Sequence, residues 1–244
     1  MPKALQSSTL TSVTVIAIIM LSLMALRAPT ARGDVTVLTS APGSLSYWAF
    51  LEERAAAHRD PSATSAVVAR LHAQTYERTS ELVMVIAEVE NLRGELWYHV
   101  RLPSRPNNVT GWLPQYKLGE LRTTTKLLVI NRRRLTATLI DRGRITFRAR
   151  VGIGRAKWPT PAGEFYVRSK FAHTSGVYGK LAFGTSATSD VLTDWPGGGY
   201  IGLHGTDQPE LLPGRVSHGC VRFRNADIVR LGTKLGIGTP ISIR

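Results

Sequence analysis

Short runs of β-branched and aromatic residues, separated by turn-forming residues, are the feature that most limits the folds open to this chain. The 244 residues include 22 Gly and 13 Pro, which recur with Ser and Thr at intervals too short for long helices. The last part of the chain has the one convincing helical stripe, formed by Ile228, Leu231 and Leu235, and Asn225 precedes it as a good N-cap. We therefore expect a mainly β fold with one helix.

Length and composition indicate a globular protein of two modest domains. The chain is longer than a typical single domain. Its hydrophobic share of 43% is ordinary for a folded protein and excludes a disordered one.

The N-terminal residues 1–33 contain an apolar run from Val13 to Leu26. This run is short for a membrane span but suits the core of a secretory signal. Lys3 gives the segment before this run a weak positive charge, as a signal peptide requires. Ala28-Pro29-Thr30 is a poor match to a signal-peptidase cleavage site. We expect export to the cell wall, the periplasm or the extracytoplasmic face of the membrane, with a cleaved signal peptide or an uncleaved anchor. A buried core helix is the weaker alternative.

Residues 34–62 are expected to be a linker that contains one short helix. Ser44 or Ser46 can cap this helix, Glu52 and Glu53 lie in its early turns, and Pro61 ends it.

Residues 63–121 are expected to form a small β domain. The segments "LVMVIAEV" and "LWYHVRL" are rich in strand-forming residues, and "NLRGE" makes a turn between them. About five short strands in such a segment suggest a small barrel. The sequence "LWYHVRLP…VTGWLP" resembles the bacterial SH3-like modules that accompany cell-wall enzymes.

Residues 122–244 also read as strands. "KLLVIN", "LTATLI" and "ITFRARVGIG" are separated by the hairpin signals "NRRR" and "DRGR", where Gly143 can take a positive φ. "WPTPAGEFYV" then forms a turn into another strand, and "TPISI" closes the chain as a strand after the helix.

Positive charge is concentrated in this second half. Up to Leu121 the chain has 11 Lys and Arg against 10 Asp and Glu, whereas from Arg122 onwards it has 20 against 7. The charge step indicates a domain boundary near residue 121 and an anionic partner. No recognition helix or zinc-finger pattern accompanies it, so we expect no nucleic acid. An anionic cell-wall surface fits, and a solvated arginine-rich surface is the alternative.

The chain's only cysteine, Cys220, lies in "SHGCVRFRN". A catalytic thiol needs a base, usually an imidazole, within about 3 Å of its sulfur. His218 is two residues away, while His204 lies on a neighbouring segment that a turn-rich loop can bring across from Cys220. Geometry favours His204 without deciding the matter, and His173 reads as a surface residue. A zinc site and a buried structural thiol are the weaker alternatives.

Two linked motifs resemble a known family. "GYIGLHGT", ten residues and then "SHGCVRFRN" resemble the signature of the YkuD-type L,D-transpeptidase catalytic domain, over about residues 123–244. The resemblance implies a mostly β fold with a helix beside the catalytic cysteine, and acyl transfer on peptidoglycan stem peptides without cofactor or metal.

The resemblance also implies roles for individual residues. Cys220 matches the nucleophile, His204 the general base and the Gly205 carbonyl the group that orients it, while the N–H groups of Gly219 and Cys220 would bind the oxyanion. We expect Arg222 to bind a stem carboxylate, and His218, Ser217 and Asn225 complete the candidate substrate site. Tyr178, Trp195 and Tyr200 could line the cleft or only pack.

Three rival functions remain at this stage. An L,D-carboxypeptidase would open the same thioester with water. A papain-like thiol peptidase would place its cysteine before its histidine, whereas His204 precedes Cys220 here. A non-catalytic wall-binding protein would leave the thiol idle.

Overall fold

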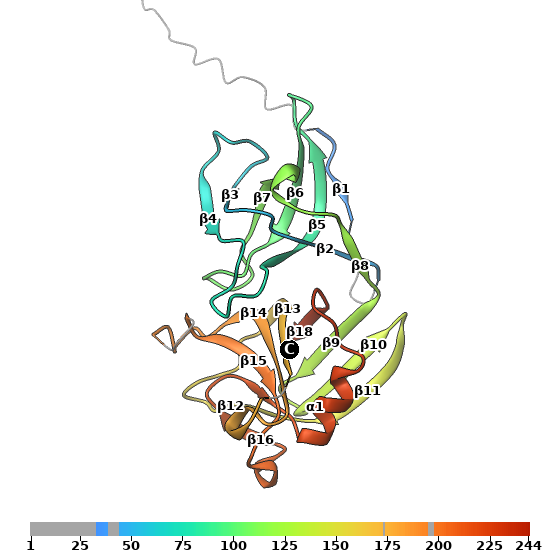
Figure 1. Cartoon of the computed structure of the whole chain (residues 1–244), viewed down its shortest axis with the longest axis vertical. Coiled ribbons are helices and arrows are strands. Elements are labelled where there is room, and N and C mark those ends of the chain that lie inside the picture. Colours follow the sequence, from blue (N-terminus) through green and yellow to red (C-terminus); the bar gives the residue numbers. More distant parts are fainter. Residues whose placement is uncertain (1–32, 39–43, 173, 195–197) are drawn as a thin grey trace, which may run out of the picture. The chain divides into compact units, whose positions relative to one another are not determined.

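The computed structural model describes residues 33–38, 44–172, 174–194 and 198–244, which form two β-sheets (Figure 1). The N-terminal sheet has the strand order β4-β3-β7-β6-β5-β2-β8, and β1 pairs with β5. Its elements are β1 (Thr36–Val37), β2 (Ser46–Phe50), β3 (Ala55–His58), β4 (Val67–Leu71), β5 (Leu82–Glu90), β6 (Leu96–Arg101), β7 (Thr110–Pro114), the 3₁₀ turn η1 (Gln115–Lys117) and β8 (Arg122–Thr124).

The C-terminal sheet has the order β11-β10-β9-β18-β13-β14-β15-β17-β12-β16. Its elements are β9 (Lys126–Asn131), β10 (Thr136–Asp141), β11 (Arg144–Arg150), β12 (Gly152–Gly154), β13 (Gly163–Ala172), β14 (Leu181–Thr188), β15 (Tyr200–His204), β16 (Gly214–Ser217), β17 (Val221–Arg222) and β18 (Pro240–Ile243), with the 3₁₀ turns η2 (Gly176–Tyr178) and η4 (Pro209–Leu211) and the helix α1 (Asn225–Gly232). The mainly β fold with one α-helix is confirmed over the described residues.

The predicted hairpins form where turn residues separate the strands. The Asn91 side chain accepts hydrogen bonds from the N–H groups of Arg93 and Glu95, which closes the turn between β5 and β6. Gly143 takes a φ of 74° between β10 and β11, a conformation that favours glycine.

The helix expected between Ser44 and Pro61 is wrong, because this segment contributes two strands. Strand β2 pairs with β5 on one side and β8 on the other, so its backbone groups are satisfied by neighbours distant in sequence. In β3, Ala57 is fully buried, and a Cβ built on Gly111 would lie 3.1 Å from the Ala57 Cβ. Close strand packing, rather than helix propensity, therefore explains the alanines.

The limits of the two sheets differ from the limits of the segments predicted from the sequence. Strands β2 and β3 lie within the segment predicted as a linker, yet they belong to the N-terminal sheet. Strand β8 pairs with β2 although it lies beyond residue 121. The change of sheet therefore occurs at Thr125, between β8 and β9.

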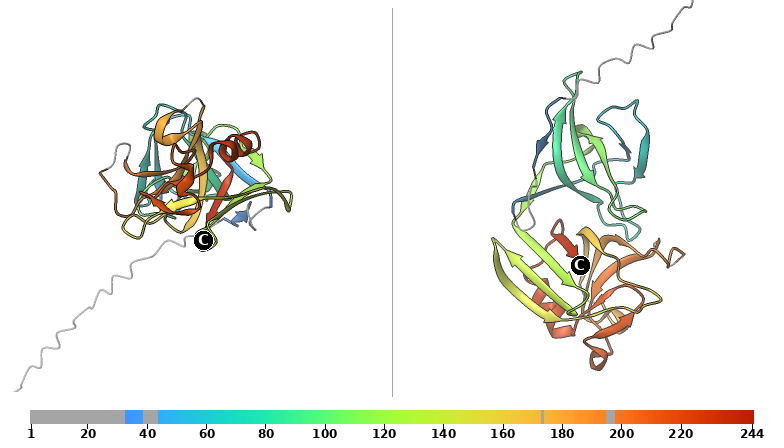
Figure 2. Two further views of the ribbon diagram at one scale, coloured as in Figure 1. Left: turned by 90° about the horizontal axis from the view of Figure 1, so that it is seen from below. Right: turned by 180° about the vertical axis from the view of Figure 1, so that it is seen from behind.

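Helix α1 covers the core of the C-terminal sheet. Ile228 and Leu231 are fully buried and join an apolar cluster with strand residues of that sheet, as the predicted stripe requires. In both sets of views α1 lies beside β11 (Figures 1 and 2), where Arg230 donates to the Arg148 carbonyl. The predicted N-cap is wrong: Arg224 occupies the N-cap position without a side-chain cap, because the Asn225 side chain bonds elsewhere.

The N-terminal apolar run lies outside the described residues. Within them, no helix has the length and apolar character needed to cross a bilayer.

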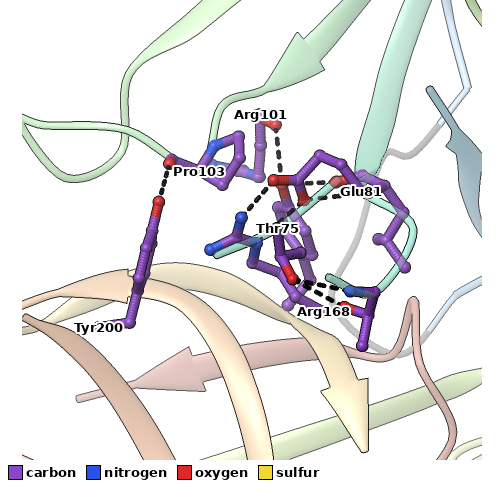
Figure 3. A network of polar contacts seen from close by, with 9 residues as sticks. Thr75, Glu81, Arg101, Pro103, Arg168 and Tyr200 are labelled. Carbon is purple, nitrogen blue, oxygen red and sulfur yellow. Dashed lines mark hydrogen bonds and ion pairs between the residues drawn. The ribbon is translucent and has the colours of Figure 1, made fainter. Parts of the chain in front are cut away.

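A buried ion pair joins β13 of the C-terminal sheet to residues beside β5 (Figure 3). Arg168 Nε donates to Glu81 Oε1 over 2.9 Å, a second bond links Arg168 Nη2 to Glu81 Oε2, and both side chains are 6% exposed. Tyr166 is fully buried against Trp48, Leu82 and Met84, and its hydroxyl donates to the Leu82 carbonyl over 3.1 Å. Apolar and ionic contacts therefore join the two sheets.

Removing one member of this ion pair should destabilise the protein more than removing both. Arg168→Met leaves the Glu81 carboxylate buried and unpaired, which we expect to lower the free energy of unfolding by about 3–5 kcal/mol. The double variant Glu81→Leu/Arg168→Met should lose less. Urea unfolding measures both, and Lys117→Met, which breaks the exposed pair with Glu53, is the control with little expected change. Equal losses in the single and double variants would contradict the prediction.

Candidate active site

The parallel pairing of β15 with β17 brings the two candidate catalytic residues together. Leu203 lies opposite Val221, and His204 lies opposite Arg222. Side chains two residues apart on a strand share a face, which places His204 on the face of Gly202. A Cβ built on Gly202 would lie 3.8 Å from both Cys220 Sγ and His204 Cδ2. Glycine at this position therefore leaves the space in which the sulfur and the imidazole approach each other.

A tight turn presents Cys220 just before β17. The Ser217 hydroxyl donates to the Cys220 carbonyl over 2.6 Å, and Thr160 Oγ1 donates to the Gly219 carbonyl over 2.6 Å. Gly219 has a φ of 121°, and a Cβ at this position would lie 2.8 Å from Ile201 Cδ1. A residue with a side chain would therefore strain the turn and displace its neighbour.

The expected oxyanion role of the Gly219 N–H does not fit this turn. The N–H donates to Ser217 Oγ over 3.1 Å, so it already has an acceptor. Ser217 was expected to bind substrate, but its buried hydroxyl instead holds the turn. Ser217 also borders a cavity next to Cys220.

His204 is oriented by the backbone that follows it. Its Nδ1 lies 2.6 Å from the Gly205 carbonyl oxygen. Because a carbonyl can only accept, Nδ1 carries the proton, and the neutral ring has its acceptor at Nε2. The Tyr178 ring packs edge-on to the imidazole at 5.1 Å between centroids. The Gly205 carbonyl and the Tyr178 ring therefore both restrict the orientation of the imidazole.

Asn225 holds the segment that follows His204. Its Oδ1 accepts from the N–H groups of Lys180, over 3.1 Å, and Thr206, over 3.3 Å. Its Nδ2 donates to the Thr206 carbonyl over 2.9 Å. The side chain thus joins the start of β14 to the segment that carries the Gly205 carbonyl, so it positions His204 rather than capping the helix.

Both reactive side chains favour their neutral forms in this site. Burial lowers the pKa of His204 to about 4; the bond to the Gly205 carbonyl raises the pKa, and the nearby Arg222 cation lowers it. Burial raises the pKa of the Cys220 thiol, although the Gly202 N–H, 3.3 Å from Sγ, and Arg222 act in the opposite direction. A thiol and a neutral imidazole therefore coexist at neutral pH.

Arg222 and His218 differ in what surrounds them. Arg222 is half-buried on β17 and makes no ion pair among the described residues, and its buried Nε has no hydrogen-bond acceptor there. His218 is exposed and packs against Trp158 at 4.1 Å between ring centroids. Burial, Arg155 and Arg222 lower the pKa of His218. Arg222 is therefore a cation that lines the site and has no partner charge among the described residues.

Two cavities meet at Cys220 and His204. The first, of about 260 Å³, is also lined by Ser189, Leu192, Gly199 and Arg222. The second, of about 370 Å³, is lined mainly by apolar residues and by Glu77. Tyr178, Tyr200 and Ile201 border both cavities. A thiol reachable from two sides can react in turn with two different molecules.

Sequence reasoning missed several residues of this site. The sequence indicates only that Thr160 lies in a turn between two prolines. Nothing in the sequence connects Glu77 with Cys220. Tyr178 and Tyr200, which could have been packing residues, do line the cavities. His173 and Trp195 lie outside the described residues.

The zinc alternative finds no support in this geometry. Among the residues that the structure describes, no group of three or more His, Cys, Asp or Glu side chains could hold a metal ion.

The pH dependence of thiol alkylation tests the predicted neutral pair. Because burial raises the pKa of Cys220, we expect its reaction with iodoacetamide to accelerate with pH beyond the usual cysteine pKa of about 8.5. Arg222→Gln removes a cation that lowers this pKa, so the midpoint should move to still higher pH. Mass spectrometry of the alkylated protein measures the rate. A plateau between about pH 5 and 7 would instead indicate a thiolate–imidazolium pair.

Comparison with known proteins supports one family. Residues 125–243 match the YkuD model, which describes the L,D-transpeptidase catalytic domain. The protein named L,D-transpeptidase YkuD in Bacillus subtilis (strain 168) is 29% identical over 108 residues, which are 44% of this chain and 59% of that protein. L,D-transpeptidase YqjB of the same strain is 28% identical over 123 residues, 48% of this chain and 69% of that protein. The chain thus spans about three-fifths of the length of YkuD.

One solved structure covers about half of the chain. The NMR structure of the catalytic domain from Enterococcus faecium L,D-transpeptidase is 23% identical, covers 49% of this chain and 96% of its own, and has a TM-score of 0.37. The family match covers every residue of the site in the C-terminal sheet, including His204 and Cys220. Residues 125–243 are thus similar to the L,D-transpeptidase catalytic domain that the YkuD model describes.

Proposed function

We propose that this protein is a peptidoglycan L,D-transpeptidase that acts through a thioester on Cys220. The observation that carries the proposal is the placement of His204 on β15 next to Cys220, which directly precedes the parallel strand β17. His204 Nδ1 is bonded to the Gly205 carbonyl, and both residues line the two cavities. The substrate is the tetrapeptide stem of peptidoglycan, as the family resemblance implies.

The first half-reaction forms the acyl-enzyme. His204 Nε2 takes the thiol proton as Sγ attacks the carbonyl between the L-centre and the terminal D-residue of the stem. A C–S bond forms and the C–N bond breaks. The terminal D-amino acid leaves with the proton that His204 held, so the imidazole returns to its neutral form. The N–H of Cys220 is the remaining candidate for the oxyanion, since the Gly219 N–H is bonded to Ser217.

The second half-reaction transfers the acyl group to an amine on another stem. The amine attacks the thioester and passes a proton to His204, the C–S bond breaks, and the thiolate takes the proton back. Water in place of the amine would give the L,D-carboxypeptidase reaction at the same residues.

Arg222 supports recognition of a carboxylate end of the stem. Its guanidinium lines the first cavity with Cys220 and makes no ion pair among the described residues. A guanidinium can bind a carboxylate through two parallel hydrogen bonds. His218 borders the same cavity, which supports a contact with substrate rather than the role of the base.

The remaining parts of the chain fit an exported wall enzyme. We propose that residues 1–33 are a signal peptide or membrane anchor, and that the N-terminal sheet is an SH3-like module beside the catalytic domain. The charge of the second half, 20 Lys and Arg against 7 Asp and Glu, favours an anionic cell-wall surface as partner.

Covalent labelling tests the mechanism directly. We expect wild-type protein incubated with a tetrapeptide stem to gain the mass of the acyl group. Cys220→Ala should abolish the adduct, and His204→Ala should slow its formation by about 10²–10⁴-fold, because general-base catalysis is lost. Intact-protein mass spectrometry measures both.

Two histidine variants serve as controls for that experiment. His72 is exposed on the N-terminal sheet, so His72→Ala should acylate like wild type. An adduct slowed by His218→Ala but not by His204→Ala would overturn the choice of base. Stem binding with no adduct on folded wild type would favour the wall-binding alternative.

Loss of the Asn225 side chain should slow the same acylation without touching the thiol. Asn225→Ala removes the hydrogen bonds that hold the segment after His204. We expect a decrease of about 10²-fold, because misplacing a catalytic group by about 1 Å costs that much. Asn225→Asp keeps the accepting oxygen and should lose less. Rates equal to wild type in Asn225→Ala would contradict the positioning role.

A further inference from the structure

The segment between β6 and β7, residues 102–109, makes polar contacts with the catalytic domain. We call it the β6–β7 loop. Three of its members reach residues that border the first cavity or lie next to them: Pro103, Arg105 and Asn107. Asn108 adds a contact with β13, where its Oδ1 accepts from the Glu164 N–H over 2.8 Å.

Arg105 binds both ends of the segment that runs from β14 to β15. Its Nη2 donates to the carbonyls of Gly198, over 2.5 Å, Ser189, over 3.2 Å, and Leu192, over 3.5 Å. The ends of the segment are themselves joined, since the Ser189 N–H donates to the Gly199 carbonyl over 2.8 Å. One guanidinium from the β6–β7 loop thus contacts three carbonyls of this segment.

Asn107 continues this attachment at the end of β14. Its Oδ1 accepts from the Thr188 N–H over 2.9 Å, and its Nδ2 donates to the Thr188 carbonyl over 2.7 Å. Asn107 Nδ2 also lies 3.0 Å from Asp190 Oδ1. The amide therefore pairs with Thr188 as a neighbouring strand residue would.

Tyr200 is held from the same side (Figure 3). Its hydroxyl donates to the Pro103 carbonyl over 3.1 Å. The Arg168 guanidinium, paired with Glu81 of the N-terminal sheet, lies 4.3 Å from the centre of the Tyr200 ring. Both the polar end and one face of this aromatic ring are thus fixed by contacts that involve the N-terminal sheet.

The residues held in this way form one wall of the first cavity. Ser189, Leu192, Gly199 and Tyr200 line it together with Cys220. By contrast, the thiol–imidazole pair rests on β15, β17 and Asn225, all within the catalytic domain. The substrate wall and the chemical groups are therefore supported from different parts of the chain.

We propose that the β6–β7 loop shapes the substrate-binding wall of the active site, and that Arg105 is a positioning residue for it. The inference rests on the proposed function, because it assigns this wall to the peptide stem that acylates Cys220. When a site is competent for only a fraction of the time, its apparent dissociation constant rises by the inverse of that fraction. Loss of Arg105 should therefore weaken stem binding and leave the chemistry of the bound stem unchanged.

Steady-state kinetics of full-length Arg105→Gln with a tetrapeptide stem test this proposal. We expect KM to rise about 10-fold, as for a wall competent about 10% of the time, while kcat stays within about 2-fold. Arg105→Lys keeps the positive charge but lacks the planar set of N–H donors of the guanidinium. Its KM should therefore lie between those of wild type and Arg105→Gln. Arg70→Gln on exposed β4 is the matched control, with wild-type values expected.

Two further measurements separate positioning from general damage. Iodoacetamide alkylation of Cys220 should be unchanged in Arg105→Gln, because the thiol and His204 do not depend on the loop. Hydrogen–deuterium exchange of peptides that cover residues 187–192 should be faster. The Ser189 N–H donates to the Gly199 carbonyl, and Arg105 no longer holds the neighbouring Gly198 carbonyl. An unchanged KM, or a kcat that falls in parallel with the alkylation rate, would overturn the proposal.

The exchange measurement also distinguishes failure of this proposal from failure of the proposed function. If wild type does not turn over the stem, the proposed function is wrong, whereas exchange at residues 187–192 still reports whether Arg105 holds the segment. Exchange equal to wild type in Arg105→Gln would reject the positioning role whatever the enzyme activity is.

Discussion

The parallel pairing of β15 with β17 is the contact on which the rest of the active site depends. With Leu203 opposite Val221, the Gly202 N–H donates to Cys220 Sγ, and His204 shares the face of Gly202. A shift of one residue along either strand would turn one of the two side chains to the opposite face of the sheet. Register, set by the backbone ladder and the apolar core beneath it, therefore determines whether the thiol has a base at all.

The turn before β17 and the segment after β15 fix the positions of Cys220 and His204 within this register. Ser217, Thr160 and Gly219 hold the backbone on one side of Cys220, while Asn225 holds the backbone after His204. These groups need not touch substrate. Their hydrogen bonds satisfy buried polar atoms and restrict the two side chains to one arrangement, which is the preorganisation that the proposed catalysis would require.

Burial sets the protonation states within that arrangement. Excluding water from the pair disfavours both charged forms, so burial lowers the pKa of His204 to about 4 and raises that of Cys220. Arg222 adds a positive potential that favours the thiolate and disfavours the imidazolium. The proton is therefore better transferred during attack on a substrate than before it, as general-base catalysis describes.

Much of this protein could be predicted from the sequence, because the relevant signals are local. Strand-forming runs and turn residues predicted the hairpins, and the stripe through Ile228 and Leu231 predicted helix α1. The linked motifs predicted that His204 and Cys220 lie together, and both residues line the same two cavities. Each of these features depends on residues close in the chain or on a motif with a narrow spacing.

The tertiary structure decided what depends on distant partners. Strands β2 and β3 replaced an expected helix because pairing with β5, β7 and β8 overrode local propensity. The Asn225 side chain does not cap the helix because its amide group forms hydrogen bonds with the backbone of Lys180 and Thr206. The sequence by itself determined the β-rich character and the helix, and it predicted Cys220 and His204 as the reactive residues. Only the fold placed Arg105 and Arg168 beside the substrate cavity, since contacts across more than 80 residues leave no periodic trace in a single sequence.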